Sequence, residues 1–252
     1  MISISAVIIT YNEERNIGRC LASLEGIADE IVVVDSLSTD ATQEICRKHG
    51  ARVYERSFTD FADQKNYAIT FAKYDYILSI DADEALSDEL KKSILTVKDN
   101  PLQDGYIMNR FTNFCGQWIK HTGWYPDRKL RLFHKEKAKW VGEKIHERCE
   151  MVSGGSTATL EGDILHYSFH SIDQHVDTVN RYSLMKAEAL YARGVKPKWY
   201  NYLINPAFRF FRDYVLKGGF RDGFYGYLIA KNSAHGIFLK YAKLRELYRR
   251  EL

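Results

Sequence analysis

The sequence of 252 residues contains no run of about 18 to 20 apolar residues, the length that a helix needs to cross a bilayer. Its first residues, Met1 to Ser5, carry no basic segment and lead directly into an apolar run, so a secretory signal is not expected. Only four cysteines occur, far apart and without a Cys-x-x-Cys pair, which argues against a zinc site and a disulfide framework. These absences favour a protein of a reducing cytoplasm.

Glycine is absent between Met1 and Gly18, where the first expected strand turns into a helix. A dinucleotide-binding protein carries Gly-x-Gly-x-x-Gly at that turn, so NAD and FAD binding are disfavoured. A sugar nucleotidyltransferase would also need a glycine-rich loop there. The turn instead reads Thr10-Tyr11-Asn12-Glu13-Glu14. Taken alone, this segment fits an ordinary helix start equally well, with Asn12 as the cap and the glutamates at the positive end of the helix dipole.

Neither sign of charge dominates the whole chain, but the charge is unevenly spread. The net charge is +3, and residues 196–252 hold 12 Lys and Arg against four Asp and Glu, a balance of +8 that leaves −5 for residues 1–195. This basic tail also contains 14 of the 34 aromatic residues. Basic, aromatic, amphipathic segments are typical of contacts with anionic membranes, and packing on the domain or on another subunit is the alternative. No RNA-binding motif accompanies the charge, so nucleic acid is not expected as a partner.

Continuous apolar runs alternate with amphipathic segments in the first part of the chain. The expected strands span residues 5–9, 30–34, 52–55 and 76–80. The expected helices are one with Ile17, Leu21 and Leu24 on one face, one from Thr39 or Asp40 to Gly50, and one at 62–72. This alternation predicts a parallel sheet buried on both faces, and such sheets bind ligands at the carboxyl ends of their strands.

The pattern changes after Asp104. Strands are expected at 106–114, at 129–133 and around Ile145, and helices are expected at 172–192 and 199–250, the latter broken at Pro206 and at Gly218-Gly219. We therefore expect an α/β half at residues 1–104, a β-rich half of the same domain at 105–171, and a helical appendage at 172–252.

The acidic segment Asp81-Ala82-Asp83 follows the fourth expected strand. Two carboxylates at that point can hold Mg²⁺ or Mn²⁺ together with a diphosphate, although Asp-x-Asp also occurs by chance in surface loops. Asp35 ends the second strand, where it can accept hydrogen bonds from a ribose or a uracil-like base, or simply shape a turn. Lys65 can reach a diphosphate as a point charge, or it can lie on a solvated helical face.

Four motifs resemble, in order and spacing, those of the family 2 inverting glycosyltransferases with the GT-A fold. They are Thr10-Tyr11-Asn12-Glu13-Glu14, Asp35-Ser36-Leu37-Ser38-Thr39-Asp40, Gln64-Lys65-Asn66 and Asp81-Ala82-Asp83-Glu84. Four later segments are similar to the bacterial branch that builds the lipopolysaccharide core (WaaE/KdtX-like). They are Trp124-Tyr125-Pro126-Asp127 through Arg131-Leu132-Phe133 to Ile145-His146-Glu147, and Gly218-Gly219-Phe220-Arg221-Asp222-Gly223.

The resemblance implies a Rossmann-like, mostly parallel sheet with a β-rich acceptor region, and it implies roles for single residues. The residues implied in donor binding are Thr10, Tyr11, Asn12, Glu13, Asp35, Lys65, Asp81, Ala82 and Asp83. Asp81 and Asp83 would hold the metal, with Asp83 the stronger ligand. The residues implied in acceptor binding are Trp124, Tyr125, Arg131 and His146. Arg131 can instead pair with neighbouring acids.

Glu147 stands where the resemblance implies the general base, although this chain offers His-Glu in place of the common Glu-Asp. Asp127 is the rival. An inverting transfer needs such a base to deprotonate the acceptor, and a cation for the leaving diphosphate.

The expected activity is metal-dependent, inverting transfer of a hexose or heptose from a nucleotide-sugar, with a UDP-sugar favoured. The expected acceptor is a lipid-linked glycan, most specifically the lipopolysaccharide inner core, and the expected location is the inner face of the cytoplasmic membrane, as a peripheral protein. The alternatives are another family 2 activity on exopolysaccharide or protein, or a non-catalytic, membrane-bound binder of sugar nucleotides.

Overall fold

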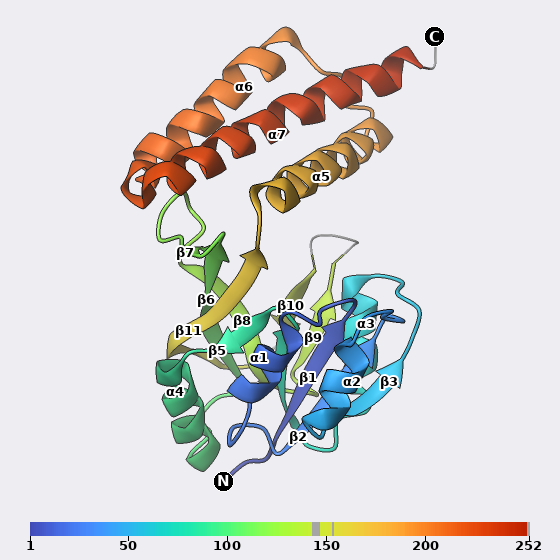
Figure 1. Cartoon of the computed structure of the whole chain (residues 1–252), viewed down its shortest axis with the longest axis vertical. Coiled ribbons are helices and arrows are strands. Elements are labelled where there is room, and N and C mark those ends of the chain that lie inside the picture. The colour runs from blue at the N-terminus through green and yellow to red at the C-terminus, as the bar shows by residue number, and fades with distance from the viewer. Residues whose placement is uncertain (143–146, 153, 251–252) are drawn as a thin grey trace. The chain divides into compact units, whose positions relative to one another are not determined.

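The computed structural model describes residues 1–142, 147–152 and 154–250 (Figure 1). The chain forms two compact units. The first contains residues Met1–Phe111 and Asp127–Tyr167, and the second contains Thr112–Pro126 and Ser168–Leu252. Residues 112–126, expected in the β-rich half, thus group with the C-terminal helices.

The first unit is built on a sheet with the strand order β3-β2-β1-β4-β8-β6-β11-β5. Its parallel part consists of β1 (Ile4–Thr10), β2 (Glu30–Asp35), β3 (Arg52–Glu55) and β4 (Tyr76–Asp81). The helices after β1, β2 and β3 are α1 (Ile17–Ser23), α2 (Thr42–Lys48) and α3 (Phe61–Ile69). The expected parallel sheet is therefore confirmed.

Antiparallel strands continue this sheet beyond β4. They are β5 (Glu84–Leu86), β6 (Gly105–Phe114), β8 (Asp127–His134) and β11 (Thr157–Phe169), with helix α4 (Asp88–Asp99) after β5. A separate hairpin pairs β9 (Ala138–Val141) with β10 (Arg148–Met151). Strand β8 runs antiparallel to both β4 and β6, so it joins the parallel part of the sheet to the rest.

Both faces of the parallel strands are buried. Along β1, Ala6 and Ile8 pack into a core cluster with Leu21 of α1, whereas Val7 packs into a second cluster with Ala68 of α3. Successive side chains of a strand point to opposite faces, so an uninterrupted apolar run fills two cores at once. The polar ends of these strands are then the places where chemistry can gather.

Two helix boundaries in this unit differ from expectation. Helix α2 begins at Thr42 rather than at residue 39 or 40, because Asp40 accepts hydrogen bonds from the backbone N–H groups of Glu14 and Thr42 and so belongs to the preceding loop. Helix α3 ends at Ile69 rather than at residue 72. The next three N–H groups bond to carbonyls three residues back, which tightens the chain out of α-helical geometry.

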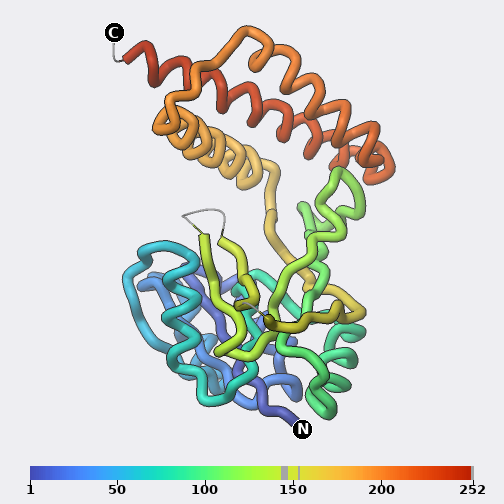
Figure 2. The backbone as a smooth tube through the Cα atoms, turned by 180° about the vertical axis from the view of Figure 1, so that it is seen from behind, coloured from blue at the N-terminus to red at the C-terminus, as the bar shows by residue number. Residues whose placement is uncertain are grey.

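The second unit consists of three long helices and short connecting elements. The helices are α5 (Ile172–Ala192), α6 (Trp199–Phe211) and α7 (Gly223–Arg249). The short elements are β7 (Gln117–Trp118), the π-helical turn η1 (Arg212–Leu216) and the 3₁₀ turn η2 (Gly219–Asp222). Helix α7 runs between α5 and α6 and packs on both (Figure 2).

The expected break at Pro206 is wrong, because Pro206 lies inside α6. Proline removes one helical hydrogen bond, and the packing of α6 on α7 offsets that loss. The break expected at Gly218-Gly219 is confirmed, with Gly218 in the left-handed region at a φ of 67°. There the chain leaves η1 and enters α7 through η2.

Residues 218–223 bind the loop that contains His121. Asp222 is buried, and its Oδ2 accepts from the backbone N–H of His121 at 2.8 Å, while its Oδ1 lies 2.8 Å from Nδ1 of the same histidine. A Cβ atom at Gly226 would lie only 1.9 Å from the carbonyl oxygen of Gly219. Glycine is thus needed at Gly219 and Gly226 because the backbone segments pack closely there. This close packing is a structural reason for the glycines of the motif at residues 218–223.

A buried histidine gives the second unit a pH dependence. His175 is 4% exposed, its ring lies edge-on to Phe114 at 4.9 Å, and burial lowers its pKa to about 4. The unfolded chain binds a proton near pH 6.5, whereas the folded chain does so only near pH 4, so stability is full above about pH 6.5 and falls as the pH drops toward 4.

We expect this loss to reach about 3 kcal/mol at most. It should appear in urea unfolding followed by tryptophan fluorescence, because Trp124 lies 6.0 Å from the ring of His175. The variant His175→Gln should be less stable at pH 7 but should lose less stability on acidification. An acid dependence between pH 6.5 and 4 that is unchanged in the variant would contradict this assignment.

Candidate active site

The strand register brings the predicted donor-binding positions to one edge of the first unit. Thr10 pairs with Asp35 across β1 and β2, and Ile9 pairs with Asp81 across β1 and β4. The carboxyl ends of the three strands therefore coincide, as expected for a parallel sheet. Asp83 follows two residues after the end of β4.

The loops after β1 and β2 are joined to each other by hydrogen bonds. Asn12, at a left-handed φ of 52°, donates its backbone N–H to Ser38 Oγ at 2.8 Å and accepts the Thr39 N–H at its Oδ1 at 2.8 Å. The Glu13 N–H donates to Thr42 Oγ1 at 2.8 Å. The segment predicted to wrap a nucleotide is thus a fixed platform, with the Tyr11 side chain 57% exposed above it.

Asp35 is fully buried beneath this platform. Its carboxylate accepts from the backbone N–H of Ser38 at 2.8 Å, from the Ser38 hydroxyl at 2.5 Å and from Gln43 Nε2 at 2.7 Å. The carboxylate therefore shapes the loop in this structure, which is the turn alternative considered from the sequence.

Asp81 is held between two cations. One carboxylate oxygen lies 2.8 Å from Lys65 Nζ and the other lies 2.8 Å from Arg131 Nη2. Burial alone would raise the pKa of Asp81, but Arg131 and then Lys65 outweigh it and hold this pKa well below its usual range. Asp81 is therefore ionised and fixed in position.

Arg131 also binds a second carboxylate, that of Glu84. Arg131 Nη2 lies 2.9 Å from Glu84 Oε1, and Glu84 Oε2 accepts the backbone N–H of Asp81 at 2.9 Å. The Arg131 side chain is 2% exposed and the Glu84 side chain is 0% exposed. Of the two roles considered for Arg131, the structure shows the pairing with neighbouring acids.

Asp83 contacts His166, a histidine that lies outside the predicted motifs. His166 Nε2 lies 3.1 Å from Asp83 Oδ2, and the backbone N–H of Tyr167 donates to the Asp83 carbonyl at 2.9 Å. Burial opposes ionisation of Asp83, yet the charge and hydrogen bond of His166 prevail and lower its pKa. The pairing of β5 with β11, in which His166 is opposite Glu84, brings this pair together. Only that long-range pairing identifies His166, because no local motif surrounds it.

Each residue of the segment Gln64-Lys65-Asn66 has a separate contact. Gln64 Nε2 donates to Ser36 Oγ at 3.2 Å, Lys65 binds Asp81, and Asn66 exchanges two hydrogen bonds with the backbone of Trp140 at 2.8 and 3.1 Å. Lys65 Nζ also lies 4.1 Å from the centre of the Trp140 ring, a cation–π contact. The lysine is thus buried in the site rather than solvated.

The two candidates for the general base differ in how tightly they are held. Glu147 Oε1 lies 3.8 Å from Lys65 Nζ. Asp127 is bound at one oxygen by Arg110 at 2.7 Å and at the other by Lys129 at 3.0 Å. His146 lies outside the described residues.

Trp124 and Tyr125, predicted to bind the acceptor, belong to the second unit. There Trp124 is half-buried and packs against a cluster that contains Phe114 and Phe169, with ring centres 6.0 and 5.9 Å away. This is the plain core role that an aromatic side chain can also fill.

Six buried polar side-chain atoms lack a hydrogen-bond partner among the described residues. They include Thr10 Oγ1, Gln64 Oε1 and Trp140 Nε1, whose residues belong to this site. Unpaired buried polar atoms are costly, so the presence of these three is consistent with a site that a polar ligand completes.

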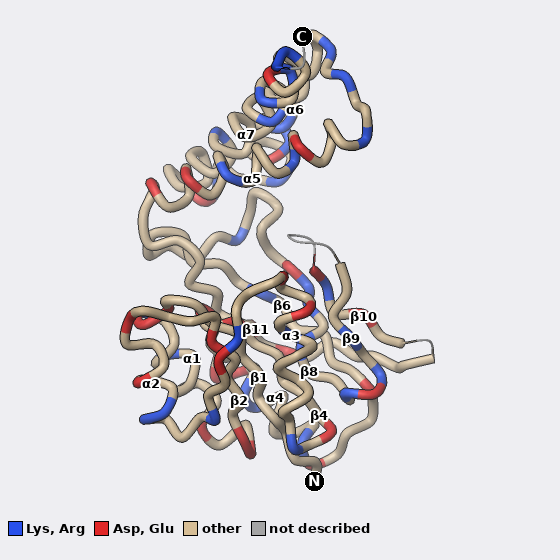
Figure 3. The backbone as a smooth tube through the Cα atoms, turned by 90° about the vertical axis from the view of Figure 1, so that its right-hand side faces the viewer, with Lys and Arg blue, Asp and Glu red and all other residues tan. Residues whose placement is uncertain are grey.

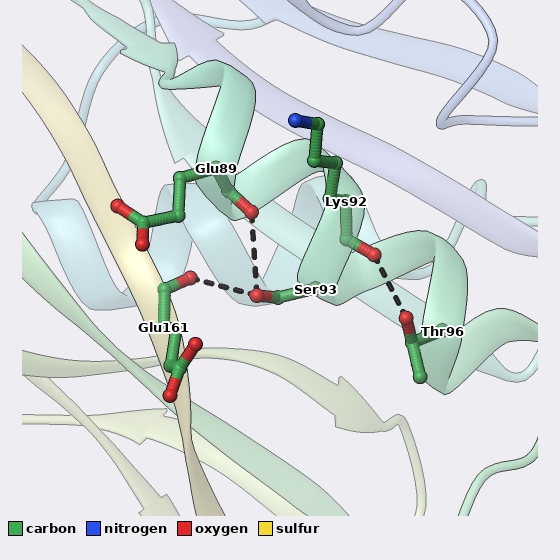
Figure 4. Close-up of a pocket in the computed structure, with 5 residues that line it drawn as sticks. All are labelled: Glu89, Lys92, Ser93, Thr96 and Glu161. Atoms are coloured by element: carbon green, nitrogen blue, oxygen red, sulfur yellow. Dashed lines mark hydrogen bonds between the residues drawn. The ribbon is translucent and has the colours of Figure 1, made fainter.

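A separate groove lies on α4 and β11 (Figure 4). It is lined by Glu89, Lys92, Ser93, Thr96 and Glu161. The Ser93 hydroxyl donates to the Glu161 carbonyl at 2.9 Å and the Thr96 hydroxyl to the Lys92 carbonyl at 3.1 Å. These polar groups satisfy one another, and none of the predicted site residues lines this groove.

In the described part of the chain, no helix is long and apolar enough to cross a bilayer. In the same residues, no group of three or more His, Cys, Asp and Glu side chains forms a ready metal cage.

Several known proteins are similar to this chain over most of its length. Residues 5–161 match the family described as Glycosyl transferase family 2. An uncharacterized glycosyltransferase of Rickettsia bellii (strain RML369-C) is 34% identical over 258 residues, which cover 97% of this chain and 86% of the relative. The lipopolysaccharide core biosynthesis glycosyltransferase LpsC of Rhizobium meliloti (strain 1021) is 30% identical, with 96% and 91% covered. The crystal structure of S. aureus TarS 1-349 in complex with UDP aligns over 100% of this chain and 92% of that chain, at 14% identity and a TM-score of 0.48.

Because Arg131 forms two buried ion pairs, we expect its replacement to lower the stability of the protein strongly. The variant Arg131→Met would leave Asp81 and Glu84 buried without their shared cation, so we expect the free energy of unfolding at pH 7 to fall by about 3–5 kcal/mol. Urea unfolding followed by circular dichroism measures this change. The matched control is Arg128→Met, because Arg128 is exposed on the same strand, and it should change stability by less than about 0.5 kcal/mol. Equal stability of the two variants would refute the proposed importance of the buried pairs.

Proposed function

Because the chain belongs to glycosyltransferase family 2, we propose that it transfers a hexose or heptose from a nucleotide-sugar, with inversion, to a hydroxyl of a lipid-linked glycan. The observation that carries this proposal is the cluster of Asp81, Asp83, Lys65 and Glu147 at the carboxyl edge of the parallel sheet. It combines fixed negative charge, a buried cation and a carboxylate that can act as a base.

The donor is proposed to bind at the platform formed by the loops after β1 and β2, with a UDP-sugar favoured. Thr10 Oγ1 and Gln64 Oε1 are buried and unpaired among the described residues, so they are suited to polar groups of the nucleotide. Lys65 Nζ, next to Asp81, is suited to the negative diphosphate as a point charge. Asp35 would act here through the loop that its carboxylate orders.

The residues present fit a divalent cation, Mg²⁺ or Mn²⁺, held in an open site. Both oxygens of Asp81 are occupied by cationic side chains, so Asp83 is the better ligand, and His166 beside it can provide a nitrogen ligand. Such cations are commonly held by one or two carboxylates and completed by substrate phosphates, which suits a site that is not a closed cage. A cation held there would neutralise charge on the departing diphosphate.

Glu147 is proposed as the general base that removes the proton from the acceptor hydroxyl. Among the described residues it makes one ion contact, with Lys65 at 3.8 Å, whereas both oxygens of Asp127 are already bound by cations at 2.7 and 3.0 Å. A base must be within reach of the substrate and have an oxygen available for the proton, and Glu147 meets the second condition better.

The acceptor is proposed to be the lipopolysaccharide inner core. The match to LpsC supports this choice, because it covers nearly the full length of both proteins. A lipid-linked acceptor also agrees with the balance of +8 in residues 196–252 and with a peripheral location on the inner face of the cytoplasmic membrane.

A first test concerns the cation. Asp83→Ala should abolish transfer while the fold survives, and His166→Ala should weaken Mn²⁺ binding in the presence of UDP by about 10- to 100-fold. Isothermal titration calorimetry measures the binding, and Mn²⁺ or Mg²⁺ should restore transfer to EDTA-treated wild type. His49→Ala, on the exposed end of α2, serves as the control and should bind Mn²⁺ as wild type does. Full transfer activity in excess EDTA would exclude a metal-dependent reaction.

A second test concerns the base. Glu147→Gln should keep donor binding but lower kcat by about 10² to 10⁴, the usual contribution of general-base catalysis. Asp127→Asn is the matched comparison and should lower kcat less. Steady-state kinetics with a panel of UDP-, GDP- and ADP-sugars measures both values and identifies the donor. If Asp127→Asn has the larger effect on kcat, the assignment of the base is reversed.

A further inference from the structure

Helix α6, the turns after it and the first turn of α7 expose many large apolar side chains. No residue of α6 is buried. We call this set the apolar face, and its members are Trp199, Leu203, Ile204, Phe208, Phe211, Val215, Leu216, Phe220 and Phe224. Their exposure is high, reaching 67% for Leu203, 58% for Phe208 and 63% for Leu216. Large apolar side chains exposed in such number on one segment indicate an interaction site.

Helical spacing separates Ile204, Phe208 and Phe211 from the side of α6 that packs on α7. Trp199 and Leu203 lie eleven and seven residues before Phe210, on its side of the helix, and are nevertheless exposed at 68% and 67%. Ile204, Phe208 and Phe211 recur at intervals of three and four residues, so they lie on one side of the helix. Phe210 and Tyr214 lie on the other side, each 5.8 Å from the ring of Tyr227 on α7. The packing of the three helices therefore leaves the members of the apolar face exposed.

The basic residues near the apolar face fall into two groups. Arg209 and Arg212 both bind the buried carboxylate of Asp213, so their charge is largely used within the unit. Lys217 and Arg221 are exposed and make no ion pair in the described part of the chain. In Figure 3, basic positions recur along the helices of this unit. The surface thus combines apolar side chains with adjacent positive charge.

This combination fits an anionic lipid surface better than a second copy of the chain. A second copy would present the same face, from a segment with a balance of +8, and would therefore offer Lys217 and Arg221 no excess of negative charge. An anionic bilayer instead offers opposite charge to the lysine and arginine and an apolar interior to the leucines and phenylalanines. Trp199, at the beginning of α6, is of the residue type enriched at the boundary between lipid and water.

We infer that the apolar face inserts into the surface of an anionic bilayer, with Lys217 and Arg221 on the lipid headgroups. The choice of lipid rests in part on the proposed function, whose acceptor is lipid-linked. Insertion of apolar side chains, rather than the charge of Arg209 and Arg212, is the main contribution to binding, because those two arginines are already paired.

The test compares two sets of exposed apolar residues in the full-length protein. The face variant is Leu203→Ser, Phe208→Ser and Leu216→Ser together, and the control variant is Val176→Ser with Leu184→Ser on α5, where both residues are similarly exposed at 43% and 42%. Co-sedimentation is measured with vesicles of phosphatidylcholine mixed with phosphatidylglycerol, and with vesicles of phosphatidylcholine alone.

Wild type and the control variant should bind the mixed vesicles more tightly than the neutral ones. The face variant should bind the mixed vesicles at least about tenfold more weakly, because three large side chains no longer gain burial in lipid. Circular dichroism should report unchanged folding of both variants, and hydrolysis of the donor by water should equal that of wild type. Quenching of tryptophan fluorescence by brominated lipids should be present in wild type and reduced in Trp199→Phe.

Vesicle binding by the face variant that equals wild type would overturn the inference. So would a wild-type dimer, formed without lipid and lost in the face variant, if wild type does not bind vesicles. A face variant that fails to bind vesicles supports the inference even if no nucleotide-sugar is hydrolysed by any form. In that case the proposed function fails and the lipid contact stands.

Discussion

The buried contact of Arg131 with Asp81 and Glu84 is the constraint on which the first unit depends. Three ionised side chains leave water together, which is costly unless each finds its partners. Arg131 comes from β8, an antiparallel strand, whereas Asp81 ends the parallel strand β4, so one guanidinium joins the two parts of the sheet. Glu84 completes the contact by accepting the Asp81 N–H, which fixes the turn between β4 and β5.

Because of this constraint, the two carboxylates of the acidic segment, Asp81 and Asp83, have different roles. Asp81 is saturated by Lys65 and Arg131, so it stabilises the edge of the sheet and positions the buried lysine. The carboxylate of Asp83, two residues later in the chain, contacts His166 instead. A motif that reads as a symmetric pair in the sequence is thus asymmetric in the folded protein, because Lys65 and Arg131 bind both oxygens of Asp81, whereas Asp83 contacts His166.

The sequence was sufficient for the parts of the fold that depend on local apolar pattern. The parallel strands and the GT-A fold are confirmed, because continuous apolar runs can be buried only in a sheet covered on both faces. Long-range contacts could not be predicted from the sequence. Nothing near His166 predicts its contact with Asp83, and the retention of α6 through Pro206 depends on packing against α7. The proposed catalytic roles of Glu147 and Asp83 remain predictions.

The two units differ in the kinds of side chain that they bury and expose. The first hides charged groups such as Glu84 and Arg131 inside, which is tolerable because these two side chains carry opposite charges and pair with each other. The second leaves apolar groups such as Leu203 and Phe208 outside, which is tolerable only if another apolar phase covers them. The uneven charge of the chain follows the same division, since the acidic part suits a cation and the basic part suits an anionic surface. The proposed function, with a water-soluble donor and a lipid-linked acceptor, would use both kinds of surface in one chain.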